Sequence, residues 1–126
     1  MDRKLVLTGL GYAILGLVLG LFMAATKNHQ QLVTHAHIML VGFVISMVYA
    51  AMYKLWLTET AEKLAKLQYL AHQLGTAGMS IGLFLLYGNL APENVVGPIL
   101  GIFSTLVLIA MVLMKVMYIK SSKSAS

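Results

Sequence analysis

The strongest indication of the kind of protein comes from the stretch Thr34-His35-Ala36-His37-Ile38-Met39-Leu40-Val41-Gly42. It begins an apolar run that continues to Tyr53, and it holds two of the four histidines. An ionisable side chain inside a membrane-length apolar segment is costly and usually marks function. Because each residue of an α-helix turns by about 100°, His35 and His37 lie about 200° apart, on opposite faces. A regular helix therefore presents only one of them to a given iron or metal ion.

The neighbours of the two histidines on the helix surface distinguish them. Small and polar residues continue the His35 face, as is typical of helix–helix contact: Met39, Gly42, Ser46 and Tyr49. Apolar residues continue the His37 face, which suits lipid or an apolar neighbour: Leu40, Val41, Val44 and Val48. We therefore expect His35 to bind a cofactor, with Met39 and Gly42 beside it and His37 as the second choice. The alternative is that His35 only hydrogen-bonds across helices while His37 lies among lipid headgroups.

The run His35-Ala36-His37-Ile38-Met39-Leu40 resembles the second transmembrane helix of the catalytic subunit of haem–copper oxygen reductases and nitric oxide reductases. In that family a His-x-x-Ile-Met-Leu type run carries an axial ligand of the low-spin haem, and His35 aligns with it. The family's copper site and its His-Pro-Glu-Val-Tyr-like motif have no counterpart here. The chain is also similar to small four-helix, oxidase-subunit-like membrane proteins with a histidine in helix three, here His72. The resemblance implies haem b rather than oxygen reduction by this chain alone.

Composition restricts the class of protein. The 126 residues are 60% hydrophobic and 10% charged, which indicates a membrane protein with one domain, residues 1–126. The absence of cysteine excludes disulfides, iron–sulfur clusters, thiolate ligation and covalent c-type haem. The net charge of +5 comes from basic residues near helix ends rather than from a patch, so we expect no nucleic-acid partner.

Four apolar spans predict an all-α, polytopic integral membrane four-helix bundle, with helices at about 5–26, 32–56, 59–87 and 94–119. Arg3 and Lys4 before the first span imitate a secretory signal. That span is about 22 residues long, however, which exceeds the 7–15 apolar residues of a signal, so we expect a retained helix. Thr58 is a suitable N-cap for the third helix. Ser121 to Ser126 is expected to be a disordered tail.

Basic residues predict the topology. One lies between the first two spans, Lys27, and the others lie on the opposite side: Arg3, Lys4, Lys54, Lys63, Lys66, Lys115, Lys120 and Lys123. By the positive-inside rule both termini are cytoplasmic, as expected of a multi-pass protein of the bacterial cytoplasmic (inner) membrane.

Glycines predict close helix packing and an oligomer. Small residues fall on one face of the first, third and fourth helices: Gly9, Gly16 and Gly20; Gly75, Gly78 and Gly82; Gly97, Gly101 and Ser104. This is more close-packing surface than one four-helix core readily uses. We therefore expect a homo-oligomer or a subunit of a larger membrane complex.

His72 is the second ligand candidate, on a small and polar stripe expected to be buried in protein: Gln68, Tyr69, Gly75, Thr76 and Met79. In an antiparallel hairpin turning near residue 57, His35 lies opposite about residue 80. His72 is then about eight residues, or roughly 12 Å, deeper. A haem shared by the two within one hairpin is therefore disfavoured. In the first alternative, His35 shares a haem with Met23 or with His35 of a second copy. In the second, His72 shares one with Met111, Met114 or His72 of a second copy. In the third, each chain contributes to two haems at different depths.

Three functions follow. The first is a haem-b protein for electron transfer or gas binding, as a small subunit of a respiratory complex. The second is a cofactor-free packing subunit whose histidines are satisfied by hydrogen bonds. The third is a Cu(I) site at His35 and Met39, which share a helix face. No hydrolytic constellation and no catalytic residue is expected, because all acids lie outside the apolar spans: Asp2, Glu59, Glu62 and Glu93.

Overall fold

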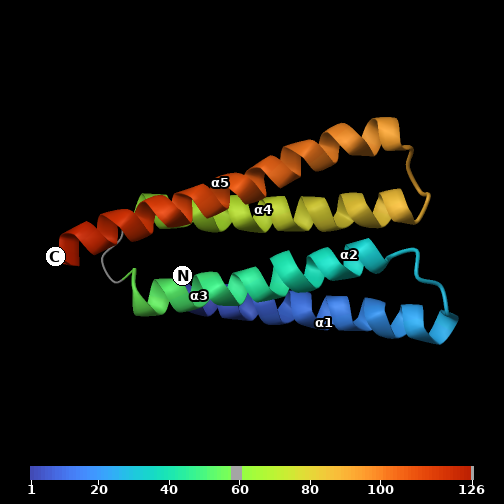
Figure 1. The fold of residues 1–126 in the computed structure, drawn as a ribbon, viewed down its shortest axis with the longest axis horizontal. Helices are drawn as coiled ribbons and strands as arrows, with labels where there is room; N and C mark the ends of the chain where they lie inside the picture. The colour runs from blue at the N-terminus through green and yellow to red at the C-terminus, as the bar shows by residue number, and fades with distance from the viewer. Residues whose placement is uncertain (58–60, 126) are drawn as a thin grey trace.

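The computed structural model describes residues 1–57 and 61–125, which form four long helices lying side by side (Figure 1). The first is α1 (Asp2–Thr26). The second is continuous through α2 (Leu32–His37), η1 (Ile38–Val44) and α3 (Ile45–Leu55). The third and fourth are α4 (Glu62–Tyr87) and α5 (Glu93–Ala125). The all-α four-helix fold is confirmed.

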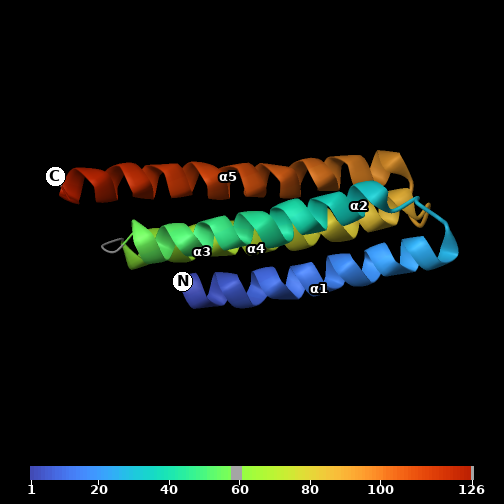
Figure 2. The ribbon, with the colours of Figure 1, turned by 60° about the horizontal axis from the view of Figure 1, so that its bottom comes forward.

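The helices run antiparallel along a common direction. Both termini lie at one end of the bundle, and the 27–31 and 88–92 connections lie at the other end (Figures 1 and 2). Lys27 ends α1 with a φ of 55°, and Asn89 follows α4 with a φ of 57°. Both residues adopt the left-handed conformation that commonly ends a helix, which Asn tolerates better than most residues.

The predicted helix ranges agree with the structure at most boundaries. The second helix ends at Leu55, one residue before the predicted end, and α1 begins at Asp2 rather than at Leu5. The third helix is present from Glu62, preceded by an extended Ala61 with ψ 124°. The predicted cap Thr58 and the predicted first residue, Glu59, lie outside the described residues.

The prediction of a disordered tail is wrong for residues 121–125, because α5 continues to Ala125. The Ser121 hydroxyl donates a hydrogen bond to the backbone carbonyl of Trp56 at 2.8 Å. The Trp56 ring also meets the Tyr118 ring edge-on, with 6.3 Å between ring centroids. These contacts attach the last turns of α5 to the end of α3, a long-range effect that local polarity does not reveal.

Three of the helices formed by the described residues are long and apolar enough to cross a membrane: α1, Leu32–Leu55 and Glu93–Ser121. Their outer surfaces carry large apolar side chains, such as Leu7 and Leu21, which are 74% and 71% exposed. Continuous apolar surface of this kind favours lipid over water. The third helix, α4, is less apolar, because it carries exposed charges in its first turns, such as Glu62 and Lys66, and a row of polar residues inside the bundle. These features are those of a multi-pass membrane protein.

The predicted glycine face of α1 packs against the second helix. Gly16 accommodates the Met39 side chain, and a Cβ at Gly20 would lie 3.0 Å from Cε1 of His35. At Gly9 a Cβ would lie 3.0 Å from Cβ of Ser46. The Gly16-x-x-x-Gly20 spacing therefore forms a shallow groove on α1 that receives two side chains four residues apart on the facing helix.

The glycines of α4 face α5, as the sequence predicts. A Cβ at Gly75 would lie 2.9 Å from the backbone oxygen of Phe103, and Gly78 accommodates the Phe103 ring. The glycines of α5 differ, since a Cβ at Gly97 or Gly101 would meet nothing within 4 Å among the described residues. The glycines of the third predicted packing face therefore have no close neighbour among the described residues.

A π-helical segment, η1, interrupts the second helix directly after His37. Every fourth residue across it is buried: Thr34, Ile38, Gly42 and Ser46. In a regular α-helix, four-residue steps drift by about 40° each around the helix axis. A π turn holds more residues and removes this drift. The segment keeps these four residues on the inner face, whereas the sequence predicts a regular helix here.

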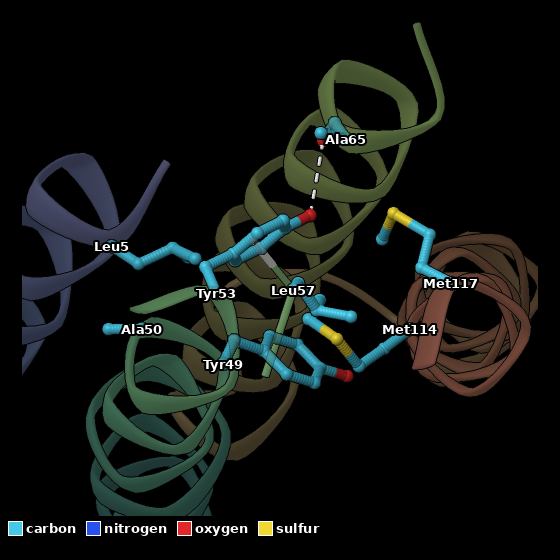
Figure 3. Close-up of a cluster of buried hydrophobic side chains, with 8 residues drawn as sticks. All are labelled: Leu5, Tyr49, Ala50, Tyr53, Leu57, Ala65, Met114 and Met117. Atoms are coloured by element: carbon cyan, nitrogen blue, oxygen red, sulfur yellow. Dashed lines mark hydrogen bonds between the residues drawn. The ribbon is translucent and has the colours of Figure 1, made fainter. Parts of the chain in front are cut away.

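A buried apolar cluster joins all four helices near the chain termini (Figure 3): Leu5, Tyr49, Ala50, Tyr53, Leu57, Ala65, Met114 and Met117. The Tyr53 hydroxyl donates to Oε1 of Gln68 at 2.7 Å, and the Ala65 carbonyl oxygen lies 3.4 Å away (Figure 3). Because a buried tyrosine needs a partner for its hydroxyl, this bond ties the cluster to the polar side of α4.

Candidate functional site

A row of buried polar residues runs along α4 at four-residue intervals: Gln68, His72, Thr76 and Ser80. Four-residue spacing places side chains on one helix face. Gln68 accepts from Tyr53 and donates from Nε2 to the Ala110 carbonyl of α5 at 3.4 Å. The stripe predicted around His72 is therefore buried in protein, apart from Tyr69, which is partly exposed and lies 5.9 Å from Nζ of Lys4.

His72 is completely buried, and both of its ring nitrogens have partners. Nε2 lies 2.7 Å from the Ser46 hydroxyl, and Nδ1 lies 3.4 Å from the Thr76 hydroxyl. The Tyr49 ring meets the imidazole edge-on, with 5.0 Å between centroids. A neutral imidazole offers one donor and one acceptor, and hydroxyls can serve either. The histidine is thus fully hydrogen-bonded, with no nitrogen left for a metal ion.

His35 has a different environment, in the glycine groove of α1. Its Nδ1 lies 2.7 Å from the carbonyl oxygen of Gly16. Since a carbonyl oxygen only accepts, Nδ1 carries the proton and donates it. In the neutral ring the lone pair then belongs to Nε2, which makes no hydrogen bond within the described part of the chain. The partly buried imidazole is therefore oriented by one nitrogen and chemically available at the other.

Met39 and Gly42, predicted beside the cofactor, face α1. The Met39 thioether packs on Gly16, and Gly42 accommodates the ring of Tyr12, whose Cγ would lie 2.7 Å from a Cβ at that position. Both residues share the His35 side of the helix, as the pattern predicts. The structure brings His35 and Met39 together on one groove and assigns Gly42 to helix packing.

His37 lies on the opposite side of the helix, as predicted. Its Nδ1 donates to the Val33 carbonyl of its own helix at 2.8 Å. Leu40, Val44 and Val48 on this side are 57%, 43% and 47% exposed, which confirms the outward, apolar face. Any group bound at His37 would lie outside the chain. The fourth histidine, His29, is exposed in the connection after α1, as expected of a loop residue.

His35 and His72, which both lie against neighbouring helices, are far apart along the bundle. His72 pairs with Ser46, which follows His35 by 11 residues, or about 16 Å at 1.5 Å per residue. The two histidines therefore lie at different depths, as the hairpin register predicts. Of the predicted partners, Met111 accepts a hydrogen bond from Tyr49 at its sulfur, and Met114 is buried in the apolar cluster.

The residues present fit a haem at His35 better than at His72. A haem iron takes four ligands from its porphyrin and needs one or two from protein. Histidine ligands typically donate the other ring N–H to a carbonyl, which orients the ring, and His35 makes this bond to Gly16. His72 would first have to lose its short contact with Ser46. Among the described residues no cluster of three His, Asp or Glu side chains is placed to hold a metal ion.

A cavity of about 570 Å³, which the sequence pattern did not predict, lies between α1, the start of α2 and α4. Ser80 lines it, and the buried Ser80 hydroxyl has no hydrogen-bond partner in the described structure. Thr34 and Gln31 also line the cavity and bond to each other, Thr34 donating to Oε1 of Gln31 at 2.6 Å. The four-residue spacing from Gln68 through His72 and Thr76 is the signal that could have included Ser80.

Comparison with known protein families, with curated proteins and with solved structures found no match to this chain. The resemblance of residues 35–40 to the second helix of the oxidase catalytic subunit stays a prediction.

Proposed function

We propose that this chain is a small integral membrane subunit that binds haem b through Nε2 of His35. Bound haem would supply electron transfer or reversible gas binding. The protein would hold and orient the ligand nitrogen, exclude water and anchor the group in the bilayer. The proposal rests first on the 2.7 Å bond from Nδ1 of His35 to Gly16, which leaves Nε2 available.

The groove of α1 supports this role of His35. Gly20 and Gly16 remove the side chains that would otherwise displace the imidazole and Met39. The position is therefore built on two packed helices rather than on a loop, which suits a ligand that must keep its orientation. His37 has the same bond pattern but only its own helix as a support.

Any second ligand of the haem iron is proposed to come from outside this chain. Met23, the predicted partner at the depth of His35, lines the 570 Å³ cavity, whereas His35 does not. A second copy's His35, or a diatomic gas, would complete the iron's coordination. The unpartnered glycine face of α5 is consistent with an oligomer or a larger complex, as proposed from the sequence.

We also propose four membrane crossings with both termini in the cytoplasm. Both termini lie at one end of the bundle, and eight of the nine basic residues belong to that end. α4 would be the fourth crossing, since it has 26 residues and turns its polar stripe inward. Labelling Asn28→Cys from outside intact cells, with Ser124→Cys unlabelled, is expected; the reverse pattern would reject this topology.

The decisive experiment is an absorption spectrum with iron and copper analysis of the protein purified from its native membrane. A Soret band is expected. His35→Ala should abolish it with unchanged yield, and the control His37→Ala should retain it. Loss of the band in His37→Ala alone would place the ligand on the opposite face. Copper without a Soret band would favour the Cu(I) site at His35 and Met39.

The second candidate function is a cofactor-free packing subunit. It is favoured by His72, whose two nitrogens are satisfied by Ser46 and Thr76, as a purely structural buried histidine requires. A colourless, metal-free protein from native membranes would select this function over haem binding.

A further inference from the structure

The 570 Å³ cavity between α1, α2 and α4 has the chemistry of a lipid-binding site. Its walls are mostly apolar, with two phenyl rings from Phe22 and Phe84 and aliphatic side chains from α1 such as Leu15 and Leu19. Its polar residues are Asn28, Gln30, Gln31, Thr34 and Ser80. None of the described residues that line it is charged or a histidine, so a charged ligand group would find no counter-charge among them.

Among the described residues that line the cavity, Ser80 carries the buried side-chain polar atom without a hydrogen-bond partner. Thr34 donates to Gln31, and Nε2 of Gln31 donates to the Phe84 carbonyl at 3.0 Å. Nδ2 of Asn28 donates to Oε1 of Gln30 at 3.4 Å. Ser80 is 6% exposed, and its hydroxyl has no partner within the described structure. A buried donor left unpaired is destabilising, and a ligand acceptor would remove that cost.

The position of Ser80 limits the ligand further. It precedes Tyr87, the last residue of α4, by seven residues, or about 10 Å along the axis. A headgroup that reaches this depth from the bilayer surface must be small and uncharged, because charges are costly within the hydrocarbon. Val18 and Ile81, which are 58% and 62% exposed, line the cavity on the outer surface, where an apolar tail could continue into the bilayer.

We propose that this cavity binds an uncharged lipid whose small head carries a carbonyl group, with Ser80 as the hydrogen-bond donor to that carbonyl. The tail would lie against α1. An acylglycerol ester and the ring ketone of a membrane quinone share this chemistry. The inference depends on membrane insertion but not on haem, since His35 does not line the cavity.

The test uses the full chain in phosphatidylcholine nanodiscs with a diazirine-tailed diacylglycerol, and peptide mass spectrometry locates the cross-links. Labelling is expected on the α1 and α4 residues that line the cavity. Dioctanoylglycerol or decyl-benzoquinone should compete, and the stronger competitor identifies the source of the carbonyl. Dioctanoyl phosphatidate and an ether-linked analogue without carbonyls should compete at least tenfold less well. Equal competition by the ether analogue would overturn the proposal.

Two pairs of variants connect the labelling to the site. Ser80→Ala should weaken competition by about three- to tenfold, the effect of one hydrogen bond, while Ser104→Ala, exposed on α5, should not change it. Val18→Trp should fill the cavity from its exposed wall and abolish labelling. Leu21→Trp, equally outward on α1 but outside the cavity, should leave labelling intact. Full labelling in Val18→Trp, or labels spread over α5, would reject the cavity as the site. His35→Ala should retain labelling, which separates this test from that of the haem.

Discussion

His72 and His35 both lie against neighbouring helices, but the two sites differ in how the imidazole is used. His72 is fully buried, with Ser46 and Thr76 at its two nitrogens and Tyr49 against its ring edge. His35 is partly buried and uses one nitrogen, which donates to Gly16. The more deeply buried histidine, His72, is therefore the one without a ring nitrogen available to bind another group.

The difference shows that burial and hydrogen-bond completeness must be considered separately. A buried imidazole with two partners stabilises the fold, because each nitrogen replaces a bond that it would have made with water. An imidazole oriented by a single carbonyl can still bind a group at its other nitrogen. On this basis α3 and α4 form the structural half of the bundle, and α1 and α2 carry the candidate site.

The largest expected effect is on the structural histidine. His72→Ala should lower the free energy of unfolding by about 2–5 kcal/mol, because it leaves a cavity and an unpaired Ser46 hydroxyl. Unfolding in mixed micelles by increasing dodecyl sulfate, followed by circular dichroism, measures this. The control His37→Ala should change stability by no more than about 0.5 kcal/mol. A smaller loss of unfolding free energy in His72→Ala than in His37→Ala would show that His72 is not the structural histidine.

Glycine-to-alanine substitutions should also differ in their effect on stability between the α4–α5 interface and the interface of α1 with the second helix. Gly75→Ala should cost about 1–3 kcal/mol, because the new methyl would meet the Phe103 backbone, which cannot move alone. Gly16→Ala should cost less, because the neighbour there is the flexible end of Met39. The same unfolding assay compares them, with Gly97→Ala as a control that meets nothing. Equal losses at Gly75 and Gly97 would contradict the α4–α5 packing.

The variant Ser46→Ala tests whether Ser46 and His72 stabilise the protein through the hydrogen bond that joins them. Ser46→Ala should cost about 1–2 kcal/mol by removing the partner of Nε2. Combined with His72→Ala, the two losses should be clearly less than additive. Combined with His35→Ala, they should add within about 0.5 kcal/mol, because those sites are distant. If the losses of unfolding free energy in Ser46→Ala and His72→Ala were additive, the short contact between the two side chains would contribute nothing to stability.

The smallest expected effect on stability belongs to the candidate ligand. His35→Ala should cost only about 0.5–1.5 kcal/mol in the cofactor-free protein, since one hydrogen bond to Gly16 and a partly exposed ring are lost. A loss as large as that of His72→Ala would assign His35 to the structural half. Reconstitution with haem should sharpen the contrast, since only the wild type would gain stability from binding.

Much of the architecture could be predicted from local pattern. Apolar length and polar turns determine the four helices, because a run of about 20 apolar residues has few alternatives. Helical periodicity places His35 and His37 on opposite faces and puts Gly9, Gly16 and Gly20 together. The hairpin register, with His35 opposite about residue 80, agrees with the observed pairing of Ser46 and His72.

Local sequence patterns are enough to predict the helices, their faces and their order. Which polar groups have hydrogen-bond partners depends on the tertiary structure. The π turn after His37, the saturation of His72 and the unpaired hydroxyl of Ser80 each depend on which residue of another helix lies opposite. So does the helical end of α5, which is held by Trp56. Hydrogen bonds between helices are formed by residues far apart in the chain, and a periodic pattern carries no information about such partners.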